Sequence, residues 1–106
     1  MTLHDAAPYR NLILTGPMGV GKTTLGRLVC DRLGAEFFDL KNEIYAQEGQ
    51  SVDAIRELYG ESRVRALETA VIRDLTLRRH SVLLIKAQAI LDETNLARLK
   101  ESGVLL

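Results

Sequence analysis

The 106-residue sequence contains one cysteine, two prolines and no tryptophan, and aromatic residues make up only 5% of it. With Cys30 alone, no internal disulfide can form and no cysteine cluster can hold zinc. Basic and acidic residues balance at 14 each, so the sequence offers no broad charged surface for nucleic acid or a membrane. We therefore expect neither of these partners, and a reducing, cytoplasmic setting.

Long apolar runs are also missing, since the longest aliphatic run covers only residues 82–85. A membrane-spanning helix needs roughly 18 apolar residues. The N-terminus lacks the basic start and apolar core of a secretion signal. Hydrophobic residues at 46% and charged residues at 26% indicate a globular domain and exclude a disordered chain. We expect a flexible arm at residues 1–10 and one domain over residues 11–106.

Strand and helix patterns alternate along the chain. Short apolar runs predict strands at 11–15, 35–39 and 81–85, and the start of a fourth strand at 104–106. Helical spacing and capping residues predict helices at 22–33, 43–48, 52–59, 61–79 and 93–101. On the first helix, Leu25, Leu28, Val29 and Leu33 share the predicted buried face. The alternation predicts an α/β fold with a parallel sheet covered by helices on both faces.

Residues 16–23 carry the strongest functional signal, a glycine, four residues, then Gly-Lys-Thr. The loop lies between an apolar strand and an amphipathic helix, the context in which backbone N–H groups and a helix N-terminus bind phosphates. Lys22 would reach the outer phosphates, and the Thr23 hydroxyl would bind Mg²⁺. The predicted phosphate-binding residues are Gly16, Met18, Gly19, Val20, Gly21, Lys22, Thr23 and Thr24.

The loop alone does not specify a reaction, because kinases, GTPases and motor ATPases share it. Many of these proteins hold magnesium with an aspartate at the end of a second apolar strand. Here the candidate strand at 82–85 is followed by Lys86, and no acidic residue occurs before Asp92. This pattern argues against an ordinary motor ATPase or GTPase.

The residues that follow the loop form a more specific pattern. It comprises Lys22-Thr23-Thr24-Leu25-Gly26-Arg27-Leu28, Phe37-Phe38-Asp39, Gly49-Gln50-Ser51-Val52, Gly60-Glu61 and Arg65-Ala66-Leu67-Glu68. In order and spacing, from about Leu12 to Leu106, the sequence resembles the N-terminal half of shikimate kinase. The resemblance implies a three-layer P-loop kinase fold with strand order 2-3-1-4-5, of which this sequence would contain 2-3-1-4 and stop before strand 5 and the lid.

The resemblance also implies an activity and a set of site residues. ATP or ADP with Mg²⁺ would bind at the loop, and the 3-hydroxyl of shikimate would be phosphorylated in aromatic amino acid biosynthesis. Lys22 and Asp39 would be catalytic, and Thr23 and Asp39 would place the metal. Arg65 would hold the shikimate carboxylate, and Glu68 would brace that arginine. From the residues alone, Asp39 could instead cap a helix, and Arg65 and Glu68 could form a surface helix pair.

Two departures from the family pattern affect the acceptor site. Lys41 stands where the family has an aspartate that accepts hydrogen bonds from shikimate hydroxyls, so an acceptor is replaced by a donor. Lys86-Ala87-Gln88 replaces three glycines, and the sequence has no glycine anywhere in residues 61–102. We therefore expect weak or absent turnover of shikimate by this chain.

Several hypotheses stay open at this point. The chain could be a shikimate-kinase-type enzyme, completed by further sequence or by a partner chain that supplies the lid. It could be a non-catalytic nucleotide-binding or regulatory relative, a fragment without its own function, or a kinase of a different, anionic acceptor. Because a fifth strand is not present, we also expect an exposed strand edge and self-association.

Overall fold

Four short parallel strands form the centre of the fold across the described residues of the computed structural model, 11–15 and 22–105. They are β1 (Asn11–Leu14), β2 (Glu36–Asp39), β3 (Ser81–Leu84) and β4 (Gly103–Leu105). Their order in the sheet is β2-β3-β1-β4, and each neighbouring pair is parallel. The predicted α/β class and the predicted order 2-3-1-4 are confirmed.

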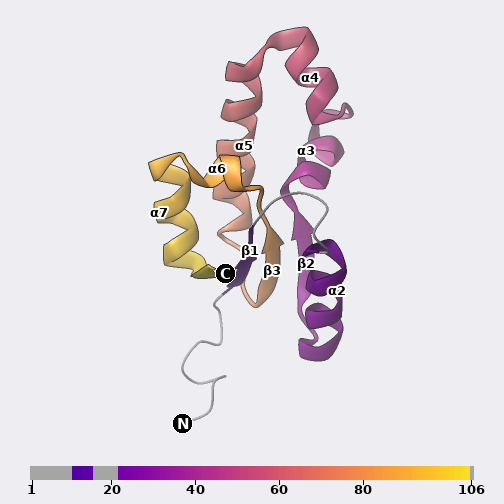
Figure 1. The fold of residues 1–106 in the computed structure, drawn as a ribbon, viewed down its shortest axis with the longest axis vertical. Helices are drawn as coiled ribbons and strands as arrows, with labels where there is room; N and C mark the ends of the chain where they lie inside the picture. Colours follow the sequence, from indigo (N-terminus) through magenta and orange to yellow (C-terminus); the bar gives the residue numbers. More distant parts are fainter. Residues whose placement is uncertain (1–10, 16–21, 106) are drawn as a thin grey trace.

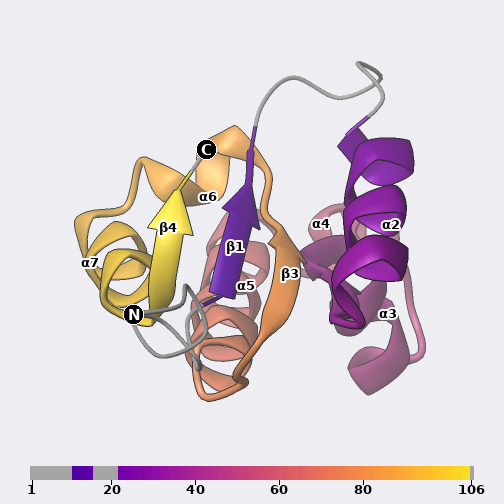
Figure 2. The ribbon, with the colours of Figure 1, turned by 90° about the horizontal axis from the view of Figure 1, so that it is seen from below.

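The helices connect these strands and cover the sheet (Figure 1). They are α2 (Lys22–Leu33), α3 (Leu40–Glu48), α4 (Val52–Tyr59), α5 (Glu61–Leu75), α6 (Ala87–Ile90) and α7 (Glu93–Ser102). Figure 2 shows α2 on one side of β3, and α5 with α7 on the other side. The one-turn helix α6 was not predicted from the sequence.

Alternate residues of the central strands face two separate clusters of buried side chains. Ile13 of β1 and Leu83 of β3 belong to the larger cluster, which includes buried residues of α5 and α7. Leu14 and Val82 belong to the smaller cluster, where they meet Cys30 of α2. Since both faces of the strands are buried, their sequences are continuously apolar rather than alternating.

Side-chain caps set the starts of three helices. Ser51 Oγ accepts the backbone N–H of Ala54 at 3.1 Å, and Asp92 Oδ1 accepts that of Asn95 at 3.0 Å. Both helices begin at the predicted positions. By contrast, α3 begins at Leu40 rather than at residue 43, because Asp39 already caps the chain at the end of β2.

The buried face of α2 differs in part from the predicted one. Leu28 and Leu33 are 53% and 60% exposed, whereas Val29 packs against the smaller cluster as predicted, and Gly26 and Cys30 are buried. The side chain of Leu25 lies outside the described part of the structure. A Cβ on Gly26 would collide with the ring of Phe37, so the missing side chain permits close contact between α2 and β2. The described packing face of α2 therefore combines Val29 with the small residues Gly26 and Cys30, which the spacing of large apolar residues does not indicate.

Helix α5 ends at Leu75, four residues before the predicted end. The Thr76 hydroxyl donates to the Arg73 carbonyl at 2.8 Å, and the chain turns there. Arg78, which the predicted helix would have included, lies beyond α5 with its guanidinium 4.6 Å from the centre of the Phe38 ring.

Candidate functional site

The carboxyl ends of β1, β2 and β3 lie at the same edge of the sheet, because the strands are parallel. We call this the carboxyl edge and define it by the residues that end these strands, Leu14, Asp39 and Leu84. After β1 the chain enters α2 on one face of the sheet, whereas after β3 it continues to α7 on the other face (Figure 2). In open α/β sheets, ligands bind outside the carboxyl ends at such a change of side.

The predicted phosphate loop follows β1 at this edge. Gly16, Met18, Gly19, Val20 and Gly21 lie outside the described residues. Lys22 and Thr23 are the first residues of α2, where the structure describes their backbone, and Thr24 is exposed.

The first turn of α2 is unlike that of the other long helices. It contains no acidic residue, whereas α3, α4, α5 and α7 each have one in the first turn. An acidic side chain there would compete for the free N–H groups and the positive end of the helix dipole. The N-terminus of α2 is therefore suited to an external anion such as a phosphate.

Asp39 ends β2 at the carboxyl edge, and its side chain caps the start of α3, which is the alternative role that the sequence left open. Its Oδ1 accepts the backbone N–H of Lys41 at 2.9 Å. A carboxylate has a second oxygen, so the cap does not prevent Asp39 from binding a cation. Magnesium commonly takes one or two protein oxygens together with phosphate oxygens, and a hydroxyl and a carboxylate at Thr23 and Asp39 would suit it.

Arg65 and Glu68 lie on α5, but the structure gives them different partners. The Arg65 side chain is 76% exposed, and its Nε lies 3.8 Å from Glu61 Oε1. The Glu68 side chain is 6% exposed, and its Oε2 lies 2.6 Å from Lys86 Nζ. The interpretation that Glu68 braces Arg65 is therefore not what this structure shows.

The Lys86–Glu68 ion pair was not predicted, although the sequence carries a signal for it. Glu68 follows Val64 by four residues and precedes Val71 by three, so it lies on the buried face of α5. A carboxylate on such a face needs a partner. Lys86, which follows the predicted third strand, was the cation available on the neighbouring segment.

A second charged cluster joins α4 to α5. Arg56 donates to Asp53 Oδ1 at 2.9 Å and to Glu61 Oε2 at 2.6 Å. The hydrogen bond from Arg56 holds the pKa of Glu61 below its usual range, with smaller electrostatic contributions from Arg65 and Lys86. Glu61 therefore stays ionised and attracts the guanidinium of Arg65.

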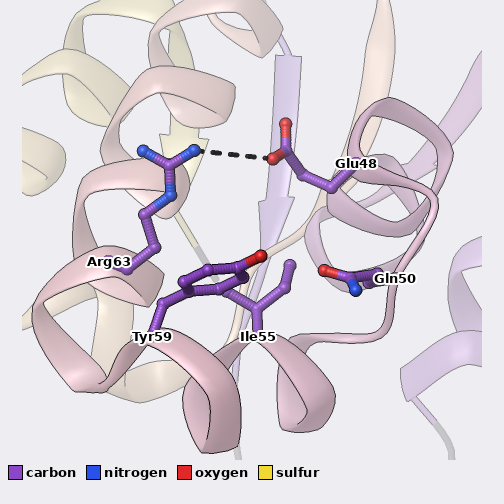
Figure 3. A pocket seen from close by; sticks show the side chains of 5 residues that line it. All are labelled: Glu48, Gln50, Ile55, Tyr59 and Arg63. Carbon is purple, nitrogen blue, oxygen red and sulfur yellow. Dashed lines mark ion pairs between the residues drawn. The ribbon is translucent and has the colours of Figure 1, made fainter.

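A pocket of about 460 Å³ is formed by residues of α3, α4 and α5 and of the loop between α3 and α4 (Figure 3). Its lining residues are Glu48, Gln50, Ile55, Tyr59 and Arg63. The Arg63 guanidinium forms an ion pair with Glu48 across this pocket, with Nη2 3.7 Å from Oε1. Tyr59, which lines the pocket, is 64% exposed. None of the predicted site residues lines this pocket.

The described ranges, 11–15 and 22–105, contain no cluster of three or more His, Cys, Asp or Glu side chains that could hold a metal. Every helix in those ranges is too short or too polar to cross a lipid bilayer.

Comparison with known proteins agrees with this geometry. The family model described as shikimate kinase matches residues 18–106. The chain belongs to the shikimate kinase family. A shikimate kinase from Burkholderia lata is 42% identical over 99 residues, which are 93% of this chain and 54% of the relative. One from Caldicellulosiruptor bescii is 35% identical over 96 residues, covering 91% of this chain and 56% of the relative.

Solved structures of the family share the fold. The shikimate kinase from Acinetobacter baumannii in complex with shikimate is 40% identical, with a TM-score of 0.87 over 92% of this chain and 54% of that protein. The enzyme from Aquifex aeolicus is 32% identical, with a TM-score of 0.83 over 90% of this chain and 56% of that protein. The chain thus spans about half the length of the family members that it matches.

Proposed function

We propose that this chain is the nucleotide-phosphate-binding half of a shikimate-kinase-type phosphotransferase, and that residues 16–24 bind ATP or ADP with Mg²⁺. One observation carries the proposal. The glycine-lysine-threonine loop joins β1 to an α2 that begins without an acidic residue, at the edge of the sheet where ligands bind. Membership of the family supports the same assignment.

The residues of the proposed site have different roles. Lys22 supplies a full positive charge for the outer phosphates, and the backbone N–H groups of residues 16–24 orient them. Thr23 and Asp39 are the side chains that would hold Mg²⁺, which when bound neutralises charge on the phosphates. Arg65 is the residue we assign to the carboxylate of the acceptor, a task that suits a guanidinium group.

A second candidate function is nucleotide binding without phosphoryl transfer to shikimate. The specific observation in its favour concerns the two residues of α5 that the resemblance assigns to the acceptor. Lys86 neutralises Glu68, and Arg65 contacts Glu61 and is exposed to solvent. The same observation weakens the hypothesis of a different, anionic acceptor, because the ammonium of Lys86 already has a buried counter-ion.

Replacing Lys22 with alanine tests the nucleotide site. Lys22 is the only charged residue of the loop, so we expect Lys22→Ala to weaken binding of ATP or ADP with Mg²⁺ by at least about tenfold. Isothermal titration of both proteins measures this effect. Lys100→Ala, which removes an exposed lysine of α7, is the matched control. Absence of magnesium-dependent binding by the unmodified chain at millimolar nucleotide would refute the site.

We also propose that the 106-residue chain self-associates or binds a completing partner chain. Strand β4 lies at an edge of the sheet, its described partner strand is β1, and its Val104 is 49% exposed. Free strand edges pair with other strands, and zero net charge provides no repulsion. We expect a dimer or larger species at micromolar concentration in size exclusion with light scattering. A sharp monomer peak with a cooperative thermal transition would contradict this prediction.

A further inference from the structure

Arg65 has two carboxylates within reach on its own helix. Glu61 precedes it by four residues and Glu68 follows it by three, and both spacings place side chains next to each other on an α-helix. The two acids differ in environment. Glu61 lies near solvent, with 45% of its side chain exposed, and already accepts a hydrogen bond from Arg56. Glu68 is buried, so an arginine paired with it would be drawn toward the sheet.

Lys86 decides this competition in the structure. It lies two residues after the end of β3, next to the fully buried Ile85, whose N–H donates to the Leu14 carbonyl at 2.9 Å. This backbone attachment fixes Lys86 beside the carboxyl end of β1. Its side chain, 28% exposed, reaches the Glu68 carboxylate at 2.6 Å. With Glu68 neutralised, Arg65 remains in the longer, exposed contact with Glu61 at 3.8 Å.

We propose that Lys86 is a specificity-determining positioning residue, which by occupying Glu68 keeps the Arg65 guanidinium turned away from the carboxyl edge and lowers the affinity for a carboxylate-bearing acceptor. Removing the ammonium leaves a buried carboxylate without a counter-ion, an arrangement that folded proteins avoid strongly. Arg65 is the nearest cation on the same helix that can replace it. Arg65 then lies closer to the sheet.

A double-mutant cycle in the full 106-residue chain tests the position of Arg65. The variants are Lys86→Gln, Arg65→Ala and the pair, each measured by urea unfolding. Arg65→Ala alone breaks an exposed pair and should change the unfolding equilibrium constant by less than about fivefold. In the Lys86→Gln chain, Arg65 holds Glu68, so the same substitution should raise that constant at least about tenfold. Additive effects, within about twofold, would overturn the proposal.

Three further variants serve as controls for this test. Glutamine at position 86 retains an N–H donor for Glu68, so it is better tolerated than Lys86→Met, the stronger form of the test. In a Glu68→Gln background no buried charge needs a partner, so the coupling between positions 65 and 86 should vanish. Lys86→Arg restores a cation and should behave like the unmodified chain. Coupling that persists in the Glu68→Gln background would also overturn the proposal, because it would not pass through Glu68.

Shikimate binding tests the consequence for specificity, and this part rests on the proposed function. We expect Lys86→Gln to bind shikimate at least about tenfold more tightly than the unmodified chain, and Arg65→Ala to remove that gain. Equal or weaker binding would overturn the proposal. Titration with ATP and Mg²⁺ distinguishes failure of this inference from failure of the proposed function. A chain that does not bind nucleotide refutes the proposed function, whereas the unfolding cycle still reports the position of Arg65.

Discussion

Replacing Gly103 with alanine is expected to lower the free energy of unfolding by at least about 3 kcal/mol, a large share of the stability of a domain of this size. A Cβ at this position would overlap the backbone carbonyl of Asn11 and lie 2.6 Å from its carbonyl carbon. The obstacle is backbone, which cannot rotate away as a side chain can. β4 would therefore have to separate from β1 along their paired residues, Asn11 with Gly103 and Leu12 with Val104. Urea unfolding followed by circular dichroism measures the loss.

Two other glycines provide matched controls for this prediction. Gly34→Ala introduces a side chain into open space at a φ of 68°, so it should cost only about 1 kcal/mol of backbone strain. Gly26→Ala meets the Phe37 ring, which can shift, so its cost should lie between the other two. An unfolding free energy for Gly103→Ala within about 1 kcal/mol of that for Gly34→Ala would show that β4 tolerates displacement.

The sequence predicted the order and type of the larger elements because these depend on local patterns. Caps at Ser51 and Asp92 and continuous apolar strands are visible without knowledge of the fold. The predicted burial of Leu28 and Leu33 on α2 was wrong, because the close approach of Gly26 to Phe37 depends on tertiary packing. The early end of α5 followed from Thr76 and the turn after it, whereas helical spacing had predicted a helix to residue 79.

The sequence supports a site prediction only where the parts of the site are contiguous. The predicted phosphate loop is a single segment with its own spacing, although most of it lies outside the described residues, and Asp39 is the last residue of a strand. The partner of Glu68 is eighteen residues away, on another element, and helical spacing alone favoured Arg65 instead. Burial decided between the two partners, since Glu68 is buried near the end of β3, where Lys86 lies, and Arg65 faces solvent.

Incubation of the 106-residue chain with ATP and shikimate is expected to release ADP at no more than about a thousandth of the rate of a complete shikimate kinase relative measured alongside it. Sites built to hydrogen-bond hydroxyls lose factors on the order of ten thousand when their polar groups are mismatched. Lys41 offers donors where the family has an acceptor. Glu68 is occupied by Lys86, and Arg65 faces solvent.

A coupled assay of ADP release, run with and without shikimate, measures this rate and separates it from background hydrolysis of ATP. The Lys22→Ala chain is the matched control, since any activity that survives the loss of that lysine comes from a contaminating kinase. Shikimate-dependent release at roughly one turnover per second or faster lies in the ordinary range for enzymes and would contradict the prediction. It would mean that the acceptor binds at the carboxyl edge with Arg65 drawn inward, so that the Lys86–Glu68 pair opens when the acceptor arrives.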